Sequence, residues 1–411
     1  MKFLKRILAS LLSGILVLLF LFNLNLYYQP AFVSLDQEKI NQDLLFQLNH
    51  LESEMHKGAA VEMQRLYPEG YVFLNALYGL SWIEVLEKVP VQSDLAQRAQ
   101  KEVEWAITEL RSDKGKAPFR GLASPRNGVF YLGWTNYVAI RYLKALPEDQ
   151  RDTLWLQTVY EELEHLRESK EKSKTLYLPS YKDACWPADN IVAMAAMSQY
   201  ESLYPHSFEA TINNWLKEIK RHEDSLGLIS HSWICRQNRF IEASRGSSQS
   251  LILNFLQEVD SVYAREKFDI YKKAFIDYRF GLPGIREYPS GVSGRGDIDS
   301  GPVILSIGGA ASIVGRRTMQ IYGEYEIAKG LRNSIETFGM SREREEQKSY
   351  LFGQLIMADA FITWSNSLEV LQADLMPEET NWRKWTHFYS FLVSLFFGYL
   401  IFRLLRKGKS L

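Results

Sequence analysis

The 411-residue sequence lacks several features that would narrow its function. It has only two cysteines, too few for a disulfide scaffold. Its 48 basic and 49 acidic residues nearly cancel, and no interior basic stripe is present, so nucleic acid is not an expected partner. Its seven histidines form neither an H-E-x-x-H motif nor a zinc-type Cys/His spacing, and it has no G-x-S-x-G elbow. We therefore predict no metal and no cofactor.

Helical periodicity dominates what is present. Apolar and amphipathic stretches with a 3.6-residue period are joined alternately by short and long loops, which places the long loops on one face. The long loops run over 112–129, 171–187, 223–246 and 281–299. We therefore predict an all-α fold, an (α/α)6 toroid or barrel, with one elaborated rim that would form the site.

The predicted helices divide into two rings. Outer helices carry charge on one face and are expected at 37–54, 94–111, 152–167, 208–221, 261–278 and 319–338. Inner helices are apolar nearly all round and are expected at 70–87, 131–143, 189–203, 248–258, 301–314 and 352–371. From the second inner helix onward, each N-terminus follows a long loop and faces the rim, where its dipole would stabilise negative charge.

Both ends of the chain are predicted to be membrane segments. The run at 7–22, extended to 28, follows three cations, and the run at 385–402 has cations on both sides. A signal peptide is the alternative at the first end, and a buried or interfacial helix is the alternative at the second. We predict an anchor at 1–28, a barrel domain at 29–380, and a transmembrane helix with a basic tail at 381–411.

The flanking cations also predict an orientation. By the positive-inside tendency both termini are cytoplasmic and the main domain is extracytoplasmic, which means periplasmic if the cell is Gram-negative. Such a compartment permits one disulfide between Cys185 and Cys235, which both lie on rim loops. A free functional thiol and an inert buried thiol remain open as alternatives.

Two rim segments carry most of the candidate chemistry. The first surrounds Cys185 and precedes an inner helix, and a thiolate there, beside a carboxylate, is suited to acid/base work. The second is glycine-rich and contains Asp297 and Asp299, which as neighbouring carboxylates are expected to raise the pKa of one of the pair. The predicted catalytic residues are Asp299, Asp297, Asp189 and Cys185, and the predicted substrate-binding residues are Trp134, Tyr137, Asp183, Trp186, Asn190, Arg245, Ser248 and Tyr288. The alternative to a functional role is a structural one, in which Asp189 or Asn190, and Ser300 or Asp299, only cap helices.

A family resemblance rests on three segments: C-W-P-A-D-N at 185–190, I-E-A-S at 241–244, and G-D-I-D-S-G at 296–301. Together they resemble the linalool dehydratase/isomerase family. The resemblance implies an α/α six-hairpin barrel and cofactor-independent addition or removal of water on a small terpenoid alcohol, with Cys185 as an acid/base cysteine. Two family residues are not matched, because the second cysteine falls near Met194 or Ala195 and the histidine falls at Gly133 or Trp134.

Three classes of function follow. The first is a lyase or isomerase acting on a small alcohol or lipid-like substrate. The second is a glycoside hydrolase, with paired carboxylates and with Trp134 and Trp186 as sugar platforms. The third is a non-catalytic component of a membrane assembly. The expected partners are a small-molecule substrate, terpenoid, lipid-like or sugar, and the membrane, and the oligomeric state is left open.

Overall fold

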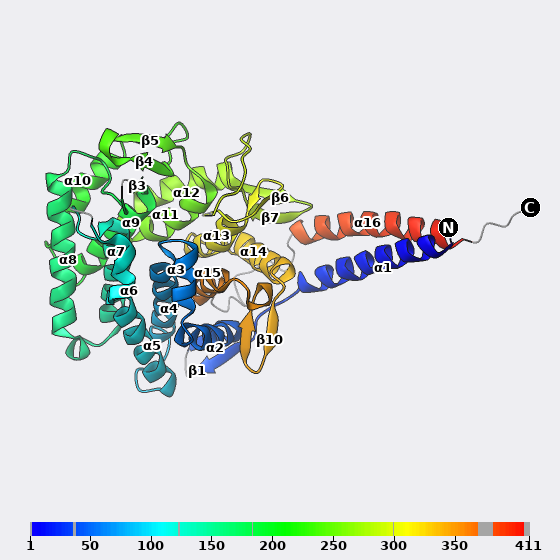
Figure 1. Cartoon of the computed structure of the whole chain (residues 1–411), viewed down its shortest axis with the longest axis horizontal. Coiled ribbons are helices and arrows are strands. Elements are labelled where there is room, and N and C mark those ends of the chain that lie inside the picture. Colours follow the sequence, from blue (N-terminus) through cyan, green and yellow to red (C-terminus); the bar gives the residue numbers. More distant parts are fainter. Residues whose placement is uncertain are drawn as a thin grey trace, which may run out of the picture.

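The computed structural model describes residues 2–35, 38–121, 124–182, 184–298, 300–368 and 381–406. Asp183 and Asp299, both predicted site residues, lie outside them. The chain is mostly helical, 66%, with two apolar helices at its ends, which confirms the predicted helical class. Figure 1 shows a helical body from which α1 (Lys2–Asn25) and α16 (Asn381–Leu405) extend side by side.

The body begins with α2 and ends with α15. Its α-helices are α2 (Gln42–His56), α3 (Ala59–Leu66), α4 (Gly70–Leu86), α5 (Asp94–Arg111), α6 (Asp113–Lys116), α7 (Gly128–Ala145), α8 (Thr153–Lys172), α9 (Pro187–Glu201), α10 (Glu209–Ile219), α11 (Gly246–Val259), α12 (Ser261–Phe275), α13 (Gly309–Ile321), α14 (Tyr325–Phe338) and α15 (Ile356–Ser367). The 3-10 turns are η1 (Ala117–Phe119), η2 (Glu148–Gln150), η3 (Cys235–Gln237) and η4 (Leu351–Gly353).

The apolar helices contact one another in sequence order. Helix α4 packs on α7, α7 on α9, α9 on α11, α11 on α13, α13 on α15, and α15 returns to α4. The more polar helices α2, α5, α8, α10, α12 and α14 each contact at least one of these six. Helix α4 is buried almost all round, whereas in α5 the buried residues recur every three or four positions.

Several of the predicted helices start or end a few residues away from the observed bounds, and two of them differ most. The predicted helix at 301–314 begins only at Gly309, because the strands β8 (Val303–Ile304) and β9 (Ile307–Gly308) pair before it. Their turn holds Leu305 and Ser306 at positive φ, without the Asn or Gly that usually reveals such a turn. The predicted helix at 319–338 is interrupted, and α14 begins only at Tyr325 after Gly323, which also has positive φ.

Short antiparallel strands decorate the body. They are β1 (Phe32–Leu35) with β2 (Glu38–Asn41), β3 (Ala184–Cys185) with β4 (Ser232–Ile234), β4 with β5 (Arg239–Glu242), β6 (Ile276–Arg279) with β7 (Leu282–Ile285), and β10 (Arg342–Arg344) with β11 (Gln347–Ser349). The β3–β4–β5 sheet joins two of the long loops, since Cys185 lies opposite Trp233.

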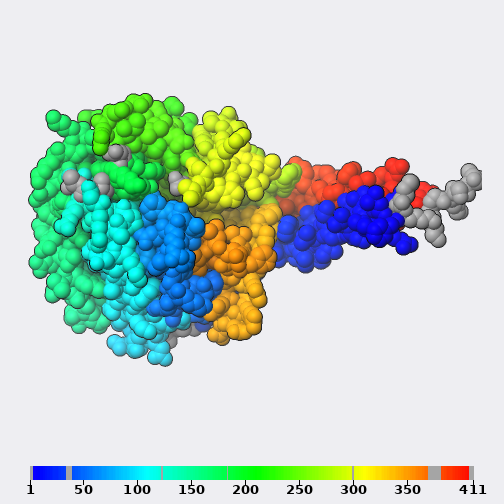
Figure 2. All heavy atoms as spheres, viewed as in Figure 1, coloured from blue at the N-terminus to red at the C-terminus, as the bar shows by residue number. Residues whose placement is uncertain are grey.

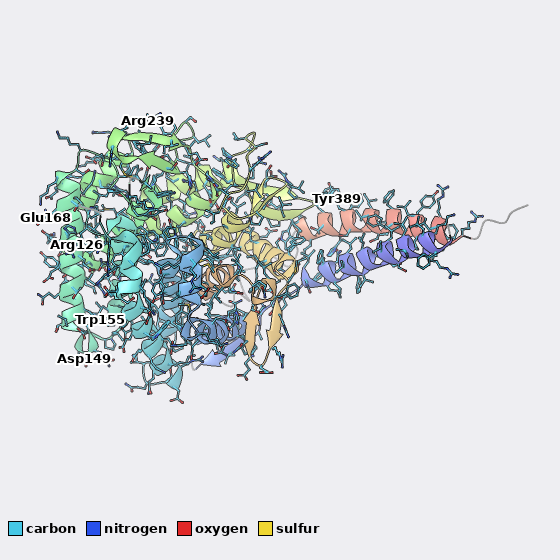
Figure 3. The ribbon with its side chains drawn as sticks, viewed as in Figure 1. Arg126, Asp149, Trp155, Glu168, Arg239 and Tyr389 are labelled. Atoms are coloured by element: carbon cyan, nitrogen blue, oxygen red, sulfur yellow. A yellow bond between two sulfur atoms is a disulfide. The ribbon has the colours of Figure 1, made fainter. Side chains whose placement is uncertain are left out.

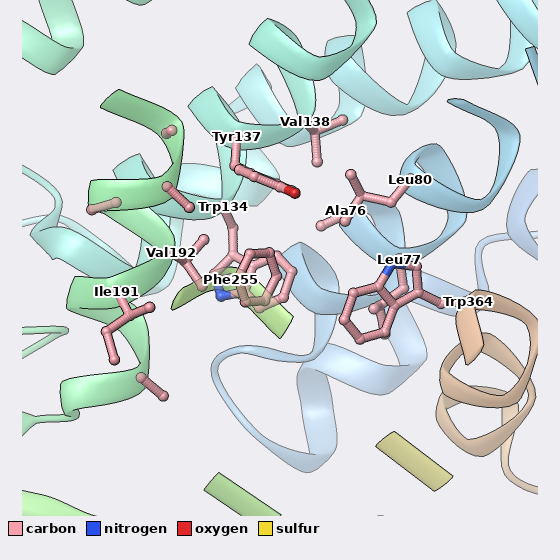
Figure 4. Packing of buried hydrophobic residues seen from close by; sticks show 14 of the residues in the cluster. Ala76, Leu77, Leu80, Trp134, Tyr137, Val138, Ile191, Val192, Phe255 and Trp364 are labelled. Carbon is pink, nitrogen blue, oxygen red and sulfur yellow. The ribbon is translucent and has the colours of Figure 1, made fainter. Parts of the chain in front are cut away.

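Aromatic side chains fill the space between the apolar helices (Figure 4). Trp134 packs edge-on against Phe255 at a centroid distance of 5.3 Å, and Phe255 stacks on Trp364 at 6.0 Å. These contacts link α7, α11 and α15 across the body. Burial of such large apolar rings is the main favourable term in the folding of the domain.

A buried charge network, formed by Glu84, Arg141, Glu258 and Arg317, lies near the C-terminal ends of α4, α7, α11 and α13. Arg317 donates to Glu84 at 2.7 Å, and Arg141 lies 3.4 Å from Glu258 and 3.7 Å from Glu84. Burial raises the pKa of Glu84, but Arg317 and Arg141 outweigh burial and hold that pKa below its ordinary value. Because helix C-termini carry partial negative charge, cations are well placed at this end.

Helices α1 and α16 contact each other along their length, and each is long and apolar enough to cross a membrane. Their side chains are mostly exposed, unlike those of a core helix. The start of α1 and the end of α16 lie at the same far end of the pair (Figures 1 and 2).

Candidate functional site

The candidate site forms where the start of α11 meets the segment that leaves β7. The backbone N–H of Gly246 donates to the carbonyl of Glu287 at 2.8 Å. A Cβ at position 246 would lie only 1.8 Å from the carbonyl oxygen of Arg286, so only glycine permits this approach. The crossing brings Arg245 and Ser247, which flank Gly246, against Glu287.

Glu287 is the buried carboxyl group of this site. Its side chain is 0% exposed, and its Oε1 accepts hydrogen bonds from Arg245 Nε and Ser247 Oγ, both at 2.7 Å. Its Oε2 is buried and finds no hydrogen-bond partner among the described residues. Burial raises the pKa of Glu287, and the bonds from Ser247 and Arg245 oppose that shift only in part.

Arg245 connects Glu287 to Asp297. Its Nη1 donates to Asp297 Oδ2 at 2.6 Å, and its guanidinium lies 5.5 Å from the ring centre of Tyr288. Burial raises the pKa of Asp297, but the Arg245 hydrogen bond and the backbone N–H of Ser300 outweigh it, so the pKa lies well below its ordinary value. The raised pKa expected for one of Asp297 and Asp299 is therefore not found at Asp297, because Arg245 lies next to it, and Asp299 lies outside the described residues.

His231 is a further titratable group in the site, and the Glu242 carboxylate lies 3.8 Å from its Nε2 and 3.7 Å from Arg245 Nη1. It is buried, and its Nε2 lies 3.4 Å from Arg245 Nη1, while its Nδ1 has no hydrogen-bond partner among the described residues. Burial and the adjacent Arg245 lower its pKa to about 4, although Asp297 acts in the opposite direction. His231 is therefore neutral at pH 7. We refer to Glu287, Arg245, Asp297, His231 and Ser247 as the Glu287 cluster.

Four of the predicted site residues belong to this cluster or touch it: Arg245, Ser248, Tyr288 and Asp297. Ser248 donates to the carbonyl of Arg245 at 3.1 Å and so stabilises the first turn of α11. Tyr288 donates to the carbonyl of Arg295 at 3.0 Å. A Cβ on Gly294 would overlap the Tyr288 ring, which explains part of the glycine content of this loop.

A second group of predicted residues lies at the start of α9. Helix α9 begins at Pro187 with Trp186 as the N-cap residue, so neither Asp189 nor Asn190 is the cap. Asp189 is buried in the first turn, where the helix dipole favours a carboxylate. The side chain of Asn190 bonds both the N–H and the carbonyl of Leu178, at 2.8 and 3.1 Å, and so fixes the preceding loop. Trp186 stacks on Tyr181 at 5.4 Å.

Cys185 forms a disulfide with Cys235, with the two Cα atoms 5.6 Å apart. The disulfide joins two of the long loops. Of the three alternatives that the sequence leaves open for these cysteines, the structure contains the disulfide. A disulfide sulfur carries no ionisable proton, so the predicted acid/base role of the Cys185 thiol is corrected.

The remaining predicted residues, Trp134 and Tyr137, lie within the body. Trp134 is fully buried and packs edge-on against Phe73 and Phe255. Tyr137 donates to Glu258 at 2.7 Å, so its hydroxyl joins the buried charge network described above. Glu258 lies at the C-terminal end of α11, whereas the Glu287 cluster lies at the N-terminal end of that helix. The described contacts of Tyr137 are therefore away from the cluster.

Sequence reasoning missed Glu287, His231 and Ser247. Glu287 lies within the long loop at 281–299, but nothing in the local pattern distinguishes it from a solvated glutamate. The one indication in the sequence is that Glu287 directly precedes Tyr288, a predicted substrate-binding residue. His231 lies within the long loop at 223–246, and its backbone N–H donates to the carbonyl of Glu242, so its approach to Arg245 depends on tertiary structure.

One group of described residues has the composition of a metal site. Glu201, His206 and Glu209 have ligand atoms within 4.8 Å of one another. They lie at the turn between α9 and α10, where Glu201 accepts from the backbone N–H groups of His206 and Phe208. Those hydrogen bonds explain why the three side chains lie close together: Glu201 stabilises the turn that carries His206 and Glu209.

Comparison with known protein families and with curated proteins gives no match to this sequence. The Glu287 cluster is therefore the part of the molecule from which a function is inferred. Its two carboxyl groups share one guanidinium, yet burial shifts the pKa of Glu287 upward while Arg245 shifts that of Asp297 downward. Two carboxyl groups with opposite pKa shifts are typical of sites that separate an acid from a base.

Proposed function

We propose that this protein is a membrane-anchored enzyme whose domain is an (α/α)6 barrel and whose Glu287 cluster performs cofactor-independent acid/base chemistry on a small alcohol or lipid-like substrate. In this proposal Glu287 carries the proton that is transferred, and Arg245 positions it. Ionised Asp297 keeps Arg245 in place. The reaction class is that of a lyase or isomerase, in line with the resemblance to linalool dehydratase/isomerase.

The observation that carries the proposal is the free oxygen of Glu287. A carboxyl group buried only for structural reasons is normally satisfied at both oxygens. Here Oε1 has two partners, whereas Oε2, Arg245 Nη2 and His231 Nδ1 are buried without a hydrogen-bond partner among the described residues. A polar substrate would supply the missing partners, and the raised pKa of Glu287 keeps a proton available for it.

The barrel and the membrane topology have support of their own. The closed series of contacts from α4 through α15 back to α4 is what an inner ring of six helices requires. The disulfide between Cys185 and Cys235 favours an oxidising compartment, so we place the domain outside the cytoplasm. With α1 and α16 side by side, both chain ends then lie in the cytoplasm, in agreement with the flanking cations.

The test uses the full-length protein in lipid nanodiscs and small molecules extracted from the native membrane, in D2O and without added cofactor. Acid/base chemistry at carbon is expected to introduce deuterium into one component, or to change its mass by one water. Glu287→Gln is expected to abolish the change, since the amide cannot supply the proton.

Glu223→Gln is the matched control, because Glu223 is bonded to Lys267 and Tyr263 and does not contact the Glu287 cluster among the described residues. Equal turnover by wild type and Glu287→Gln would contradict the proposal. Release of a sugar, with uptake of heavy oxygen in a parallel reaction in oxygen-labelled water, would support the glycosidase alternative instead. If no component changes, the non-catalytic alternative replaces the enzyme.

A further inference from the structure

Two neighbouring hairpins expose bulky apolar residues at their tips. Phe280 lies in the turn between β6 and β7, and Leu305 lies in the turn between β8 and β9. Both have positive φ, 52° and 51°, a conformation that glycine and asparagine adopt far more readily than phenylalanine or leucine. Both are exposed, Phe280 by 63% and Leu305 by 57%. If the two side chains lay in water, neither would gain free energy of burial to offset the cost of the positive φ in its turn.

The two tips lie against each other and against the base of α16. Arg279 Nε donates to the carbonyl of Leu305 at 2.8 Å, which fixes one hairpin on the other. The Phe280 ring lies 6.0 Å from the Tyr389 ring, and Tyr389 lies 6.2 Å from Trp385. Figure 3 shows Tyr389 where α16 leaves the body, next to the β6–β7 hairpin.

These residues form one surface, which we call the hairpin patch: Phe280, Ile304, Leu305, Trp385 and Tyr389. Each is exposed, and each is aromatic or aliphatic. The patch is continuous with α16, a helix long and apolar enough to cross a membrane. Tryptophan and tyrosine at the end of such a helix are typical of the membrane–water interface.

We propose that the hairpin patch inserts into the interfacial layer of the same bilayer that α16 crosses, so that the domain lies against the membrane surface. The proposal rests on the membrane anchoring in the proposed function. Burial in the interface gives Phe280 and Leu305 the apolar surroundings that the domain does not provide. It also fixes the face that the domain turns toward the membrane.

The docking would bring the Glu287 cluster close to the membrane. Glu287 follows Phe280 by seven residues, so the two Cα atoms are separated by at most roughly 25 Å. Strand β7 connects the two positions directly. A substrate that partitions into the interface would then reach the cluster over a short path.

The experiment measures the depth of single sites in the full chain reconstituted into vesicles of phosphatidylcholine and phosphatidylglycerol. The sequence has only Cys185 and Cys235, which form a disulfide, so one added cysteine accepts a nitroxide selectively. Phe280→Cys and Leu305→Cys are labelled separately. Collision rates with oxygen, which enters the bilayer, and with a water-soluble nickel complex then report depth.

Two control sites give the comparison. Leu154→Cys reports water, because Leu154 is 68% exposed on α8 and its neighbour Trp155 lies far from Tyr389 (Figure 3). Leu395→Cys reports the membrane-spanning part of α16. We expect the ratio of oxygen to nickel collisions at 280 and 305 to exceed that at 154 several-fold and to lie below that at 395.

The controls separate the two ways of failing. Ratios at 280 and 305 equal to that at 154, with 395 still in lipid, overturn the docking and leave the anchoring intact. A water-like ratio at 395 overturns the anchoring and the docking together. Unchanged thermal unfolding of each labelled variant shows that the domain remains folded, so that a depth value applies to the native protein.

Discussion

The Glu287 carboxyl group and the Arg245 guanidinium form a hydrogen-bonded pair that is almost completely withdrawn from water, with Arg245 Nε 2.7 Å from Glu287 Oε1. Arg245 does not cancel the upward pKa shift of Glu287. Burial raises this pKa more than the hydrogen bond from Arg245 lowers it, and Arg245 also donates to Asp297. This imbalance distinguishes the cluster from an ordinary structural ion pair, in which the carboxylate is held ionised. The chemistry that we propose depends on it.

His231 makes the stability of the domain sensitive to acid. The unfolded chain binds a proton at this imidazole near pH 6.5, whereas the folded domain binds it only near a pKa of about 4. Acid therefore favours the unfolded state, and the stabilisation present above pH 6.5 is lost as the pH falls toward 4. The difference amounts to about 3 kcal/mol. We expect His231→Gln to lose stability less steeply than wild type between pH 6.5 and 4 in urea unfolding, and parallel curves would contradict this.

The disulfide should stabilise the domain by limiting the unfolded chain. Cys185 and Cys235 are 50 residues apart, and closing such a loop lowers the free energy of folding by about 4 kcal/mol in the chain-entropy model. The Cys185→Ser/Cys235→Ser double variant is therefore expected to unfold at a lower denaturant concentration. Thiol labelling of protein taken from cells checks the premise, since the proposed compartment predicts no reactive thiol before reduction.

The buried charge network should be intolerant of a missing cation. Arg317→Met leaves Glu84 buried without its closest partner, which is expected to cost about 3 to 5 kcal/mol. Adding Glu84→Gln should recover part of this loss, because the unpaired charge is then removed. Arg65→Met is the control: Arg65 and Glu62 are both mostly exposed, and such pairs contribute about 0 to 1 kcal/mol. Equal unfolding midpoints for the two arginine variants would show that the network is dispensable.

Gly246 should be essential for assembly of the Glu287 cluster. In Gly246→Ala the new methyl group would meet the carbonyl oxygen of Arg286, so α11 and the segment after β7 must separate. We expect a lower melting temperature and loss of the hydrogen bond from Gly246 to Glu287. Gly309→Ala is the matched control, because the nearest atom to its Cβ would be 3.5 Å away. If both variants have the melting temperature of wild type, the close approach at Gly246 is not required for assembly of the Glu287 cluster.

The sequence predicts helices better than it predicts this site, for a physical reason. Helix α5 is predicted with its observed bounds, 94–111, because Ser93 caps it and its apolar positions recur every three or four residues. The turn at Leu305 and Ser306 has no such local signal, since neither residue favours positive φ. There the pairing of β8 with β9 overrides local preference, and the predicted helix at 301–314 starts late.

The site shows the same division. Arg245 and Asp297 could be selected because they lie on long loops that precede inner helices. The direction of the Asp297 pKa could not be derived, because it depends on a guanidinium 52 positions away in sequence. Glu287 has no motif of its own, and its burial arises from the crossing of two distant segments at Gly246. Local patterns thus locate the rim, whereas tertiary contacts decide which carboxyl group retains a proton.

The central claim concerns the proton on Glu287, and infrared titration tests it without knowledge of the substrate. The carbonyl stretch of a protonated carboxyl group is recorded for wild type and for Glu287→Gln as the pH is raised. We predict a band that persists above pH 4.5, the ordinary pKa of glutamate, and that is missing from Glu287→Gln. A difference between the two proteins that disappears at or below pH 4.5 would show that Glu287 is an ordinary ionised partner of Arg245, and it would contradict the account.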